Sequence, residues 1–216
     1  MSAAVFRERP AASAAGEPSG LLVLHHGRGT DEHDLLPLAD VLDPQKRLHV
    51  VTPRAPLTLP GWGGHHWYVV PRVGYPDPQT FAASYALLAE FHDELWQRTG
   101  LAPERTVLGG FSMGSVMSYA LALGRDRPAP AGVLAFSGFV PTVEGWTPSF
   151  DDRQALRALI RHGTEDPVID VAFARTAHEQ LLAGGLDVDY GEFAGGHTIS
   201  PSSIPAAEQW LAQLIP

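Results

Sequence analysis

A serine flanked by two glycines limits the possible folds of this chain more than any other feature. Segment 110–114 reads Gly-Phe-Ser-Met-Gly, directly after the apolar run 106–108 and before the helical stretch 115–123. In a sharp turn between a strand and a helix, Ser112 projects its hydroxyl above the sheet, and the flanking glycines avoid collisions with neighbouring backbone. The following helix directs free N–H groups at any charge that develops on a bound carbonyl. The pattern alone also fits an ordinary glycine-rich turn, so the downstream residues decide between the two interpretations.

Two downstream segments supply an acid and a base. In 159–169 an apolar run enters a glycine-containing loop that ends in Glu165 and Asp166, and a helical pattern follows. The alternating stretch 188–193 is typical of a last strand, and it breaks at Ala-Gly-Gly before His197. Of the two acids, Asp166 is the expected partner because it directly precedes a proline, whose fixed geometry ends the loop before the helix.

Serine, acid and histidine therefore occur in chain order, each after a predicted strand. The carboxyl ends of parallel strands are where such sheets place their ligand sites. Taken singly, an aspartate before proline is a common turn former, and a histidine after two glycines is a common loop residue. Together they favour a catalytic triad in which Ser112 is the nucleophile, Asp166 orients the imidazole and His197 acts as general base and then acid.

A glycine-rich loop after an early strand predicts an oxyanion hole. The continuous apolar run 21–25 is typical of a strand buried on both faces, and it breaks at His-Gly-Arg-Gly in 26–29. Such a hole needs one N–H from the residue after the nucleophile and a second from this loop. The expected donors are the backbone N–H groups of Met113 and Arg28.

The side chains of this loop have expected roles of their own. We expect the Arg28 side chain to form a salt bridge with Asp31, Glu32 or Asp34 rather than to contact substrate. His26 is expected to hydrogen-bond within the loop and hold its shape, with a role as a second catalytic base as the alternative.

Taken together, these motifs resemble the small phospholipase/carboxylesterase family, which is related to the acyl-protein thioesterases and dienelactone hydrolase-like proteins. The resemblance spans residues 18–214 and rests on four segments: 24–39, 110–115, 162–169 and 195–199. It implies a single-domain α/β-hydrolase fold without a separate cap domain, and a serine esterase that acts on short or medium acyl esters and needs no cofactor. The chain differs from dienelactone hydrolases in having no cysteine, and from typical acyl-protein thioesterases in having Met113 where they carry glutamine.

Composition agrees with a small enzyme and excludes several other classes of protein. With 216 residues, 44% of them hydrophobic and 18% charged, the chain fits one compact domain, 1–216. A formal charge of −9 argues against nucleic acid and anionic membrane surfaces as partners. No stretch approaches the roughly 18 apolar residues of a membrane span, and the start 1–20 lacks the apolar region of a secretory signal. We therefore expect a cytoplasmic protein whose partner is a small-molecule ester.

Strand and helix patterns alternate along the chain, which predicts a mostly parallel sheet with helices on both faces. The clearest helical pattern covers 81–98, and a shorter helix is expected near 34–42. Ahead of these, an edge strand at 4–9 and a turn at 14–20 are expected to make up the lead-in 1–20. Further strands are expected at 48–52 and 132–137, and a closing helix at 203–215.

The proline- and aromatic-rich segment 53–78 is expected to be a long loop that lines the substrate cleft, as its family counterparts do. Within it Trp67 is a candidate pocket wall, and the alternative is that Trp62 and Trp67 only anchor a surface loop. Trp146 is a candidate for the opposite wall. The adjacent histidines at 65–66 lack a third spaced ligand, so we expect no metal site.

Two function classes remain open from the sequence. The first is a hydrolase that forms an acyl-enzyme at Ser112, with carboxylic esters as main substrates and lysophospholipids or thioesters as variants. The second is a small-ligand-binding protein that keeps the hydrolase fold without turnover. The complete set of triad and oxyanion-hole elements favours the first. Because segment 140–154 is too short for a helical lid, we expect a shallow cleft that prefers short to medium acyl chains.

Overall fold

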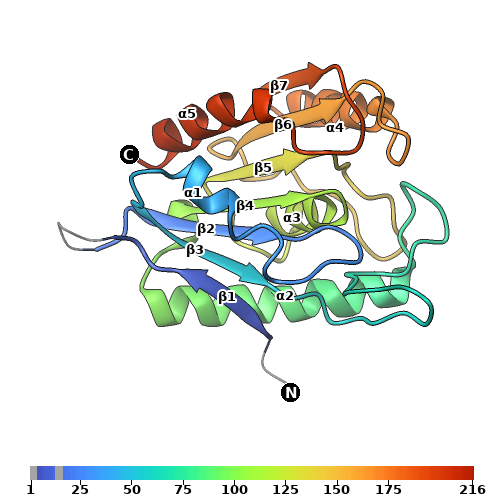
Figure 1. Ribbon diagram of the computed structural model, residues 1–216, viewed down its shortest axis with the longest axis horizontal. Coiled ribbons are helices and arrows are strands. Elements are labelled where there is room, and N and C mark those ends of the chain that lie inside the picture. Colours follow the sequence, from blue (N-terminus) through green and yellow to red (C-terminus); the bar gives the residue numbers. More distant parts are fainter. Residues whose placement is uncertain (1–3, 13–16) are drawn as a thin grey trace.

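Seven strands form one sheet in the computed structural model, which describes residues 4–12 and 17–216 (Figure 1). Their order across the sheet is β1-β3-β2-β4-β5-β6-β7, and all neighbours run parallel except β1, which pairs antiparallel with β3. The carboxyl ends of the parallel strands therefore meet at one edge of the sheet. The strands are β1 (Phe6–Arg9), β2 (Gly20–His25), β3 (Leu48–Pro53), β4 (Thr106–Phe111), β5 (Gly132–Phe136), β6 (Arg157–Gly163) and β7 (Asp187–Phe193).

Helices cover both faces of this sheet (Figure 1). On one face lie α2 (Pro78–Thr99), α3 (Met113–Leu123) and α4 (Val171–Ala183). On the other lie α1 (Leu38–Leu42) and α5 (Ile204–Leu214), which contact each other. Two short 3-10 turns, η1 (Pro103–Arg105) and η2 (Pro201–Ser203), precede β4 and α5.

Strand β2 explains why the fold needs helices on both sides. Leu21 and Val23 belong to the core that the sheet shares with α2, α3 and α4, whereas Leu22 and Leu24 belong to the core shared with α1 and α5. A strand buried on both faces reads as a continuous apolar run, which is the pattern at 21–25. The predicted α/β fold, with a mostly parallel sheet and helices on both faces, is confirmed.

The two predicted helices on the amino-terminal side of the elbow differ in how well their bounds were predicted. Helix α2 extends beyond 81–98 because Asp77 caps it, accepting a hydrogen bond from the N–H of Thr80 at 2.9 Å, and it ends at Gly100, whose φ is 70°. The helix expected near 34–42 covers only Leu38–Leu42. Residues 32–37 form successive turns, and Pro37, which has no N–H, stands directly before the helix.

The lead-in was predicted as an edge strand followed by a turn, and segment 53–78 as a long loop. Strand β1 accounts for most of the edge strand expected at 4–9, while part of the turn expected at 14–20 lies outside the described residues. Between β3 and α2 the chain forms isolated bridges, such as Leu57 with His66, but no helix or strand. This loop projects at the carboxyl-terminal edge of the sheet (Figure 1). None of the helices in the described part of the chain has the length and apolarity to cross a membrane.

Candidate active site

Ser112 occupies the turn between β4 and α3 in a backbone conformation that serine rarely adopts. Its φ of 54° and ψ of −120° lie outside the regions ordinary for L-residues. A Cβ on Gly114 would collide with the carbonyl oxygen of His25, and a Cβ on Gly110 would come 2.5 Å from the backbone of Gly114. Gly114 therefore lets the turn pass this close to β2, Gly110 lets the turn close on itself, and the serine hydroxyl is held at the carboxyl end of β4.

A second serine fixes this elbow to strand β5. The Oγ of Ser115 lies 2.6 Å from the carbonyl oxygen of Gly110 and 2.8 Å from that of Phe136, and it accepts a hydrogen bond from the Phe136 N–H at 3.1 Å. The N–H of Ser112 also donates to the Phe136 carbonyl, at 2.9 Å. Sequence reasoning did not single out Ser115, although its place directly after the motif's last glycine was a usable signal.

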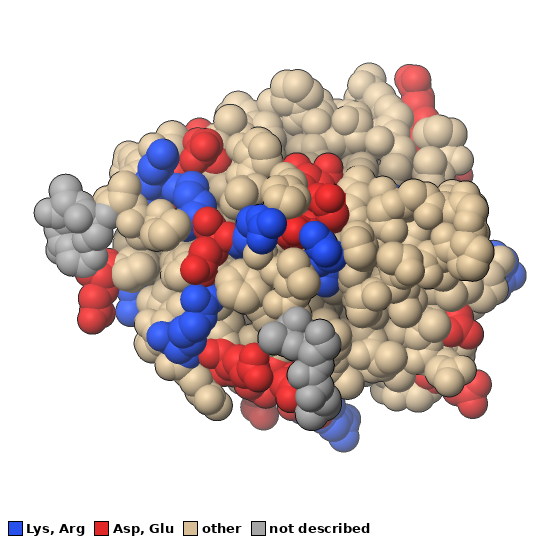
Figure 2. Space-filling model, turned by 60° about the horizontal axis from the view of Figure 1, so that its bottom comes forward, with Lys and Arg blue, Asp and Glu red and all other residues tan. Residues whose placement is uncertain are grey.

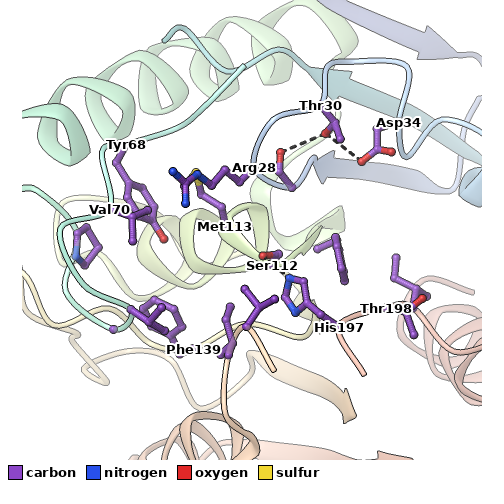
Figure 3. Close-up of a pocket in the computed structure, with 18 of the residues that line it drawn as sticks. Arg28, Thr30, Asp34, Tyr68, Val70, Ser112, Met113, Phe139, His197 and Thr198 are labelled. Atoms are coloured by element: carbon purple, nitrogen blue, oxygen red, sulfur yellow. Dashed lines mark hydrogen bonds between the residues drawn. The ribbon is translucent and has the colours of Figure 1, made fainter. Parts of the chain in front are cut away.

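Ser112, His197 and Asp166 form a hydrogen-bonded chain across the carboxyl ends of β4, β7 and β6. The Nε2 of His197 lies 2.8 Å from the Oγ of Ser112, and its Nδ1 lies 2.7 Å from the Oδ2 of Asp166. Figure 3 shows the His197 ring directed at Ser112. The structure thus brings together the three residues that the sequence predicted as a triad. In this arrangement a proton can pass from the hydroxyl to the imidazole.

The carboxylate of Asp166 is held by the backbone of its own loop. Its Oδ1 accepts hydrogen bonds from the N–H groups of Val168 at 2.8 Å and Ile169 at 2.9 Å, which leaves Oδ2 for His197. Burial raises the pKa of Asp166, but these two N–H groups and His197 outweigh it, so the pKa lies below its ordinary value. The neighbouring Glu165 is exposed to solvent. The acid that faces the histidine is therefore Asp166, as the proline after it suggested.

A second histidine lies behind this carboxylate. His162, on β6, is fully buried, and its Nε2 lies 2.8 Å from the carbonyl oxygen of Ile169 and 3.2 Å from the Oδ2 of Asp166. Since a carbonyl oxygen only accepts, the Nε2 carries the proton and faces both oxygens. Through these two contacts His162 helps to hold the loop 164–169 in place. It was part of the motif in 162–169, but its role could not be assigned without knowing which way its ring points.

The two expected oxyanion donors, Arg28 and Met113, both line the cavity onto which Ser112 opens. Met113 is the first residue of α3, where a backbone N–H has no partner within the helix. Within the described residues, the N–H of Arg28 donates no hydrogen bond either. Both N–H groups are thus available at the cavity that contains the serine hydroxyl.

His26 holds the shape of the loop that carries Arg28. Its Nε2 accepts a hydrogen bond from the N–H of Ala55 at 3.0 Å, so its proton is on Nδ1, which donates to the carbonyl oxygen of Gly27 at 2.7 Å. Burial lowers the pKa of His26, which favours the neutral ring that these two hydrogen bonds require. The hydrogen bonds within and next to the loop agree with the expected structural role, and His26 does not line the cavity.

Contrary to expectation, neither Trp67 nor Trp146 lines the cavity. Trp67 is fully buried, with its indole Nε1 donating to the carbonyl oxygen of His26 at 2.9 Å. Trp146 packs edge-on against Phe81, with ring centroids 6.2 Å apart. The neighbouring aromatic residues Trp62 and Tyr68 lie on the cavity instead. Adjacent residues of an irregular segment face different sides, and the sequence does not say which faces the substrate.

The cavity has a volume of about 600 Å³ and extends to both sides of Ser112. In Figure 3, Tyr68, Val70 and Phe139 form an apolar wall on one side of the serine. On the other side lie the polar residues Thr30, Asp34 and Thr198, with the Oγ1 of Thr30 donating to the Oδ2 of Asp34 at 3.0 Å. Tyr68 itself is buried, which raises the pKa of its phenol. The site therefore offers one apolar side and one polar side to a substrate.

Arg28 does not form the expected salt bridge, and each of the three acids has another partner. Glu32 is bound by the guanidinium of Arg54 at 2.5 and 2.6 Å, and Asp34 accepts from a threonine. Asp31 accepts a hydrogen bond from the N–H of His33 at 2.9 Å. The Arg28 guanidinium instead lies over the ring of Trp62, 3.8 Å from its centroid, and its side chain extends beside Tyr68 in Figure 3.

One cluster in the described part of the chain has the spacing of metal ligands, and it consists of Asp31, Glu32 and His33. Both carboxylate oxygens of Glu32 are already bound by Arg54, which holds the pKa of Glu32 down to about 2. The adjacent histidines at 65–66 are not part of this cluster. The residues of the cluster therefore act as partners of arginine and histidine side chains.

Comparison with known proteins assigns this chain to a family. The sequence profile of the phospholipase/carboxylesterase family matches residues 10–215. The chain belongs to this family. Acyl-protein thioesterase 1 of Gibberella zeae is 30% identical over 132 residues, which cover 58% of this chain and 56% of that protein. Acyl-protein thioesterase 1 homolog 1 of Dictyostelium discoideum is 22% identical over 209 residues, which cover 92% of each chain.

A solved structure supports the same assignment. The crystal structure of esterase PE8 is 28% identical in sequence, with a TM-score of 0.79, and the match covers 98% of this chain and 99% of that one. The predicted membership of the phospholipase/carboxylesterase family is therefore confirmed. The chain is a hydrolase of a family whose members include esterases and acyl-protein thioesterases.

Proposed function

We propose that this protein is a serine esterase that cleaves short- to medium-chain carboxylic esters through an acyl-enzyme on Ser112. The observation that carries the proposal is the hydrogen-bonded chain from Ser112 through His197 to Asp166, with distances of 2.8 and 2.7 Å, which opens onto a largely apolar cavity. Lysophospholipids and acyl thioesters are side substrates that the same chemistry could process. A small-molecule ester is the proposed partner, in the cytoplasm.

In the first half of the reaction, the Oγ of Ser112 attacks the ester carbonyl carbon while the Nε2 of His197 takes the hydroxyl proton. The negative charge moves to the carbonyl oxygen, and the backbone N–H groups of Arg28 and Met113 are the proposed donors that stabilise it. The carbon–oxygen bond to the alcohol then breaks, and His197 returns its proton to the departing alkoxide. Asp166 holds the imidazole and stabilises its protonated form throughout.

In the second half, water replaces the alcohol. His197 takes a proton from the water, the resulting hydroxide attacks the acyl carbon, and the same two N–H groups stabilise the second oxyanion. Collapse breaks the bond to Ser112 Oγ, which regains its proton from His197, and the carboxylic acid leaves. No redox step or cofactor takes part in this cycle.

The size of the cavity supports a preference for shorter acyl chains. The apolar side is bounded by Tyr68, Val70 and Phe139, and segment 140–154, between β5 and β6, contains no helix that could form a lid. Each methylene buried against that wall contributes about 0.8 kcal/mol, whereas one beyond it contributes little. The rate constant kcat/KM should therefore peak at short to medium chains and fall for long ones.

A fluorophosphonate probe tests the catalytic assignment against the alternative of a ligand-binding protein without turnover. We expect the probe to modify Ser112, and p-nitrophenyl esters from acetate to decanoate to be hydrolysed with a maximum at short or medium length. Ser112→Ala should resist the probe and lose on the order of 10⁴-fold or more in kcat, as triads do when the attacking atom is removed. A Ser112→Ala variant that keeps a tenth of the activity would rule out the proposal.

A further inference from the structure

Arg28 and Arg72 differ from every other basic side chain of this protein in their partners. All Lys and Arg residues fall within the described ranges 4–12 and 17–216, and each of the others pairs with a carboxylate or donates to a backbone carbonyl. On the face shown in Figure 2, the blue basic side chains lie among red acidic ones. Within the same described residues, Arg28 and Arg72 make no ion pair and no side-chain hydrogen bond.

Both guanidinium groups are instead stacked on exposed aromatic rings. The Cζ of Arg28 lies 3.8 Å from the ring centroid of Trp62, and the Cζ of Arg72 lies 3.7 Å from that of Tyr75. The two rings are 57% and 44% exposed. An arginine that contacts a ring through its face keeps the N–H groups at its edge free, and these groups match the two oxygens of a carboxylate. The stacking also restricts each side chain before any ligand binds.

Both arginines line the cavity onto which Ser112 opens. Arg28 extends on the side of Tyr68 and Val70 in Figure 3, and Arg72 is two residues beyond Val70 on the same loop. The acid that lines the cavity, Asp34, lies on the opposite side of the serine and accepts a hydrogen bond from Thr30. The Tyr68 side of the cavity therefore holds unpaired positive charge in a chain whose formal charge is −9.

We propose that the esters preferred by this protein carry a carboxylate, which Arg28 and Arg72 bind at the cavity mouth while the ester carbonyl reaches Ser112. The proposal rests on the esterase function proposed above and narrows its substrate class to half-esters of dicarboxylic acids or esters of carboxylate-bearing alcohols. In both classes of ester, Arg28 and Arg72 recognise the same group, a carboxylate in the same molecule as the ester. Binding of this kind adds charge-assisted hydrogen bonds to the apolar contacts of the cavity.

Two matched pairs of esters test the proposal and show which part of the substrate carries the anion. Mono-p-nitrophenyl glutarate and p-nitrophenyl pentanoate differ by a carboxylate on the acyl side. The pair 4-butanoyloxybenzoate and phenyl butanoate differs by a carboxylate on the leaving group. The readout is the ratio of kcat/KM for the anionic ester to that for the neutral one, compared between variants so that differences in intrinsic reactivity cancel.

We expect Arg28→Gln and Arg72→Gln each to lower this ratio about fivefold for one of the two pairs, as expected for a partly exposed charge pair. High salt should lower the ratio in the unmodified protein. Arg125→Gln is the matched control, because it removes the same charge from a guanidinium paired with Asp151 away from the cavity, and it should leave the ratio unchanged.

Two different failures are distinguishable. In the first, the neutral esters are hydrolysed, but the ratio does not change in Arg28→Gln and Arg72→Gln, or it falls equally in Arg125→Gln. Either result would overturn this inference and leave the esterase function standing. No turnover of any of the four esters would overturn the esterase function, and this inference with it.

Discussion

The nucleophile elbow and the loop 53–78 meet at the same cavity, but different kinds of constraint hold them in place. The elbow is fixed by backbone: a side chain on Gly110 or Gly114 would collide with neighbouring main chain, and hydrogen bonds tie the turn to β5. The loop contains no helix or strand: isolated backbone bridges such as Thr30 with His65 hold it at single points, and buried side chains, of which Trp67 is the largest, anchor it elsewhere. Backbone constraints are visible in a sequence as glycine spacing, whereas side-chain constraints depend on packing that the sequence does not show.

The largest effect is expected at Asp166, whose carboxylate is held by backbone N–H groups. Asp166→Asn keeps an oxygen for the N–H groups of Val168 and Ile169 but no longer holds the imidazole in the reactive tautomer, so kcat should fall by about 10³- to 10⁴-fold. Glu165→Gln, the matched control one residue away, is exposed and should change kcat less than about twofold. Rates on p-nitrophenyl butanoate, with circular dichroism to check folding, decide between them. The reverse ranking would assign the acid to Glu165.

The next effect concerns stability and separates the two tryptophans of the loop. Trp67→Ala removes a fully buried side chain and should lower the free energy of unfolding by about 3–5 kcal/mol. Trp62→Ala removes a side chain that is 57% exposed and should cost less than about 1 kcal/mol, while altering the acyl-chain preference because Trp62 lines the cavity. Urea unfolding measures both. Equal losses of stability would show that the loop is not anchored through Trp67.

A smaller effect compares one glycine from each region. Gly114→Ala places a Cβ against the carbonyl oxygen of His25 and should destabilise the protein by about 1–3 kcal/mol, with loss of activity because the elbow must move. Gly63→Ala, in the loop, meets nothing within 4 Å, so its effect should stay within about 0.5 kcal/mol. Thermal unfolding and esterase rates of the two variants provide the comparison. A harmless Gly114→Ala would contradict the view that backbone contacts fix the elbow.

The smallest effect concerns the ion pair that joins loop 53–78 to the loop after β2. Glu32 and Arg54 connect the loop after β2 to the start of loop 53–78, and the pKa of Glu32 is lowered to about 2 by this arginine. A carboxylate whose pKa is lower in the folded state stabilises the protein above its ordinary pKa of 4.5, and this contribution is lost as the pH falls from there to about 2. Glu32→Gln should therefore differ most from the unmodified protein near neutral pH and least near pH 2. A difference in urea midpoint that does not change with pH would contradict this linkage.

Much of the fold could be predicted because its elements repeat simple physical patterns. The apolar run 21–25, the helical stripe of α2 and the strand ahead of the elbow each reflect burial on defined faces. The short helix α1 was predicted too long, since an apolar pattern in 34–42 does not reveal that its first half forms successive turns. The residues of the candidate triad could be named from their order and flanking glycines, and their catalytic roles stay predictions.

The walls of the site could not be predicted in the same way. Trp67 and Tyr68 are neighbours with similar chemistry, and only the packing of the folded chain buries the first away from the cavity and places the second on it. The Arg28 side chain had three nearby acids in the sequence, but Arg54, distant in the sequence, binds the one that is buried. His162 could not be assigned for the same reason, because its role follows from a ring direction that brings Nε2 to Asp166.

The hydrogen bonds around His26 affect how this scaffold could be re-engineered. The ring accepts from Ala55 and its backbone carbonyl accepts from the indole of Trp67, so segment 53–78 supports the backbone that presents the Arg28 N–H. A loop transplanted from a relative to change substrate choice would also replace the support of that backbone. In this scaffold, a change of segment 53–78 that alters substrate choice is therefore expected to alter the turnover rate as well. A graft that preserves the contacts of Ala55 and Trp67 should keep more of its rate than one that exchanges the whole segment.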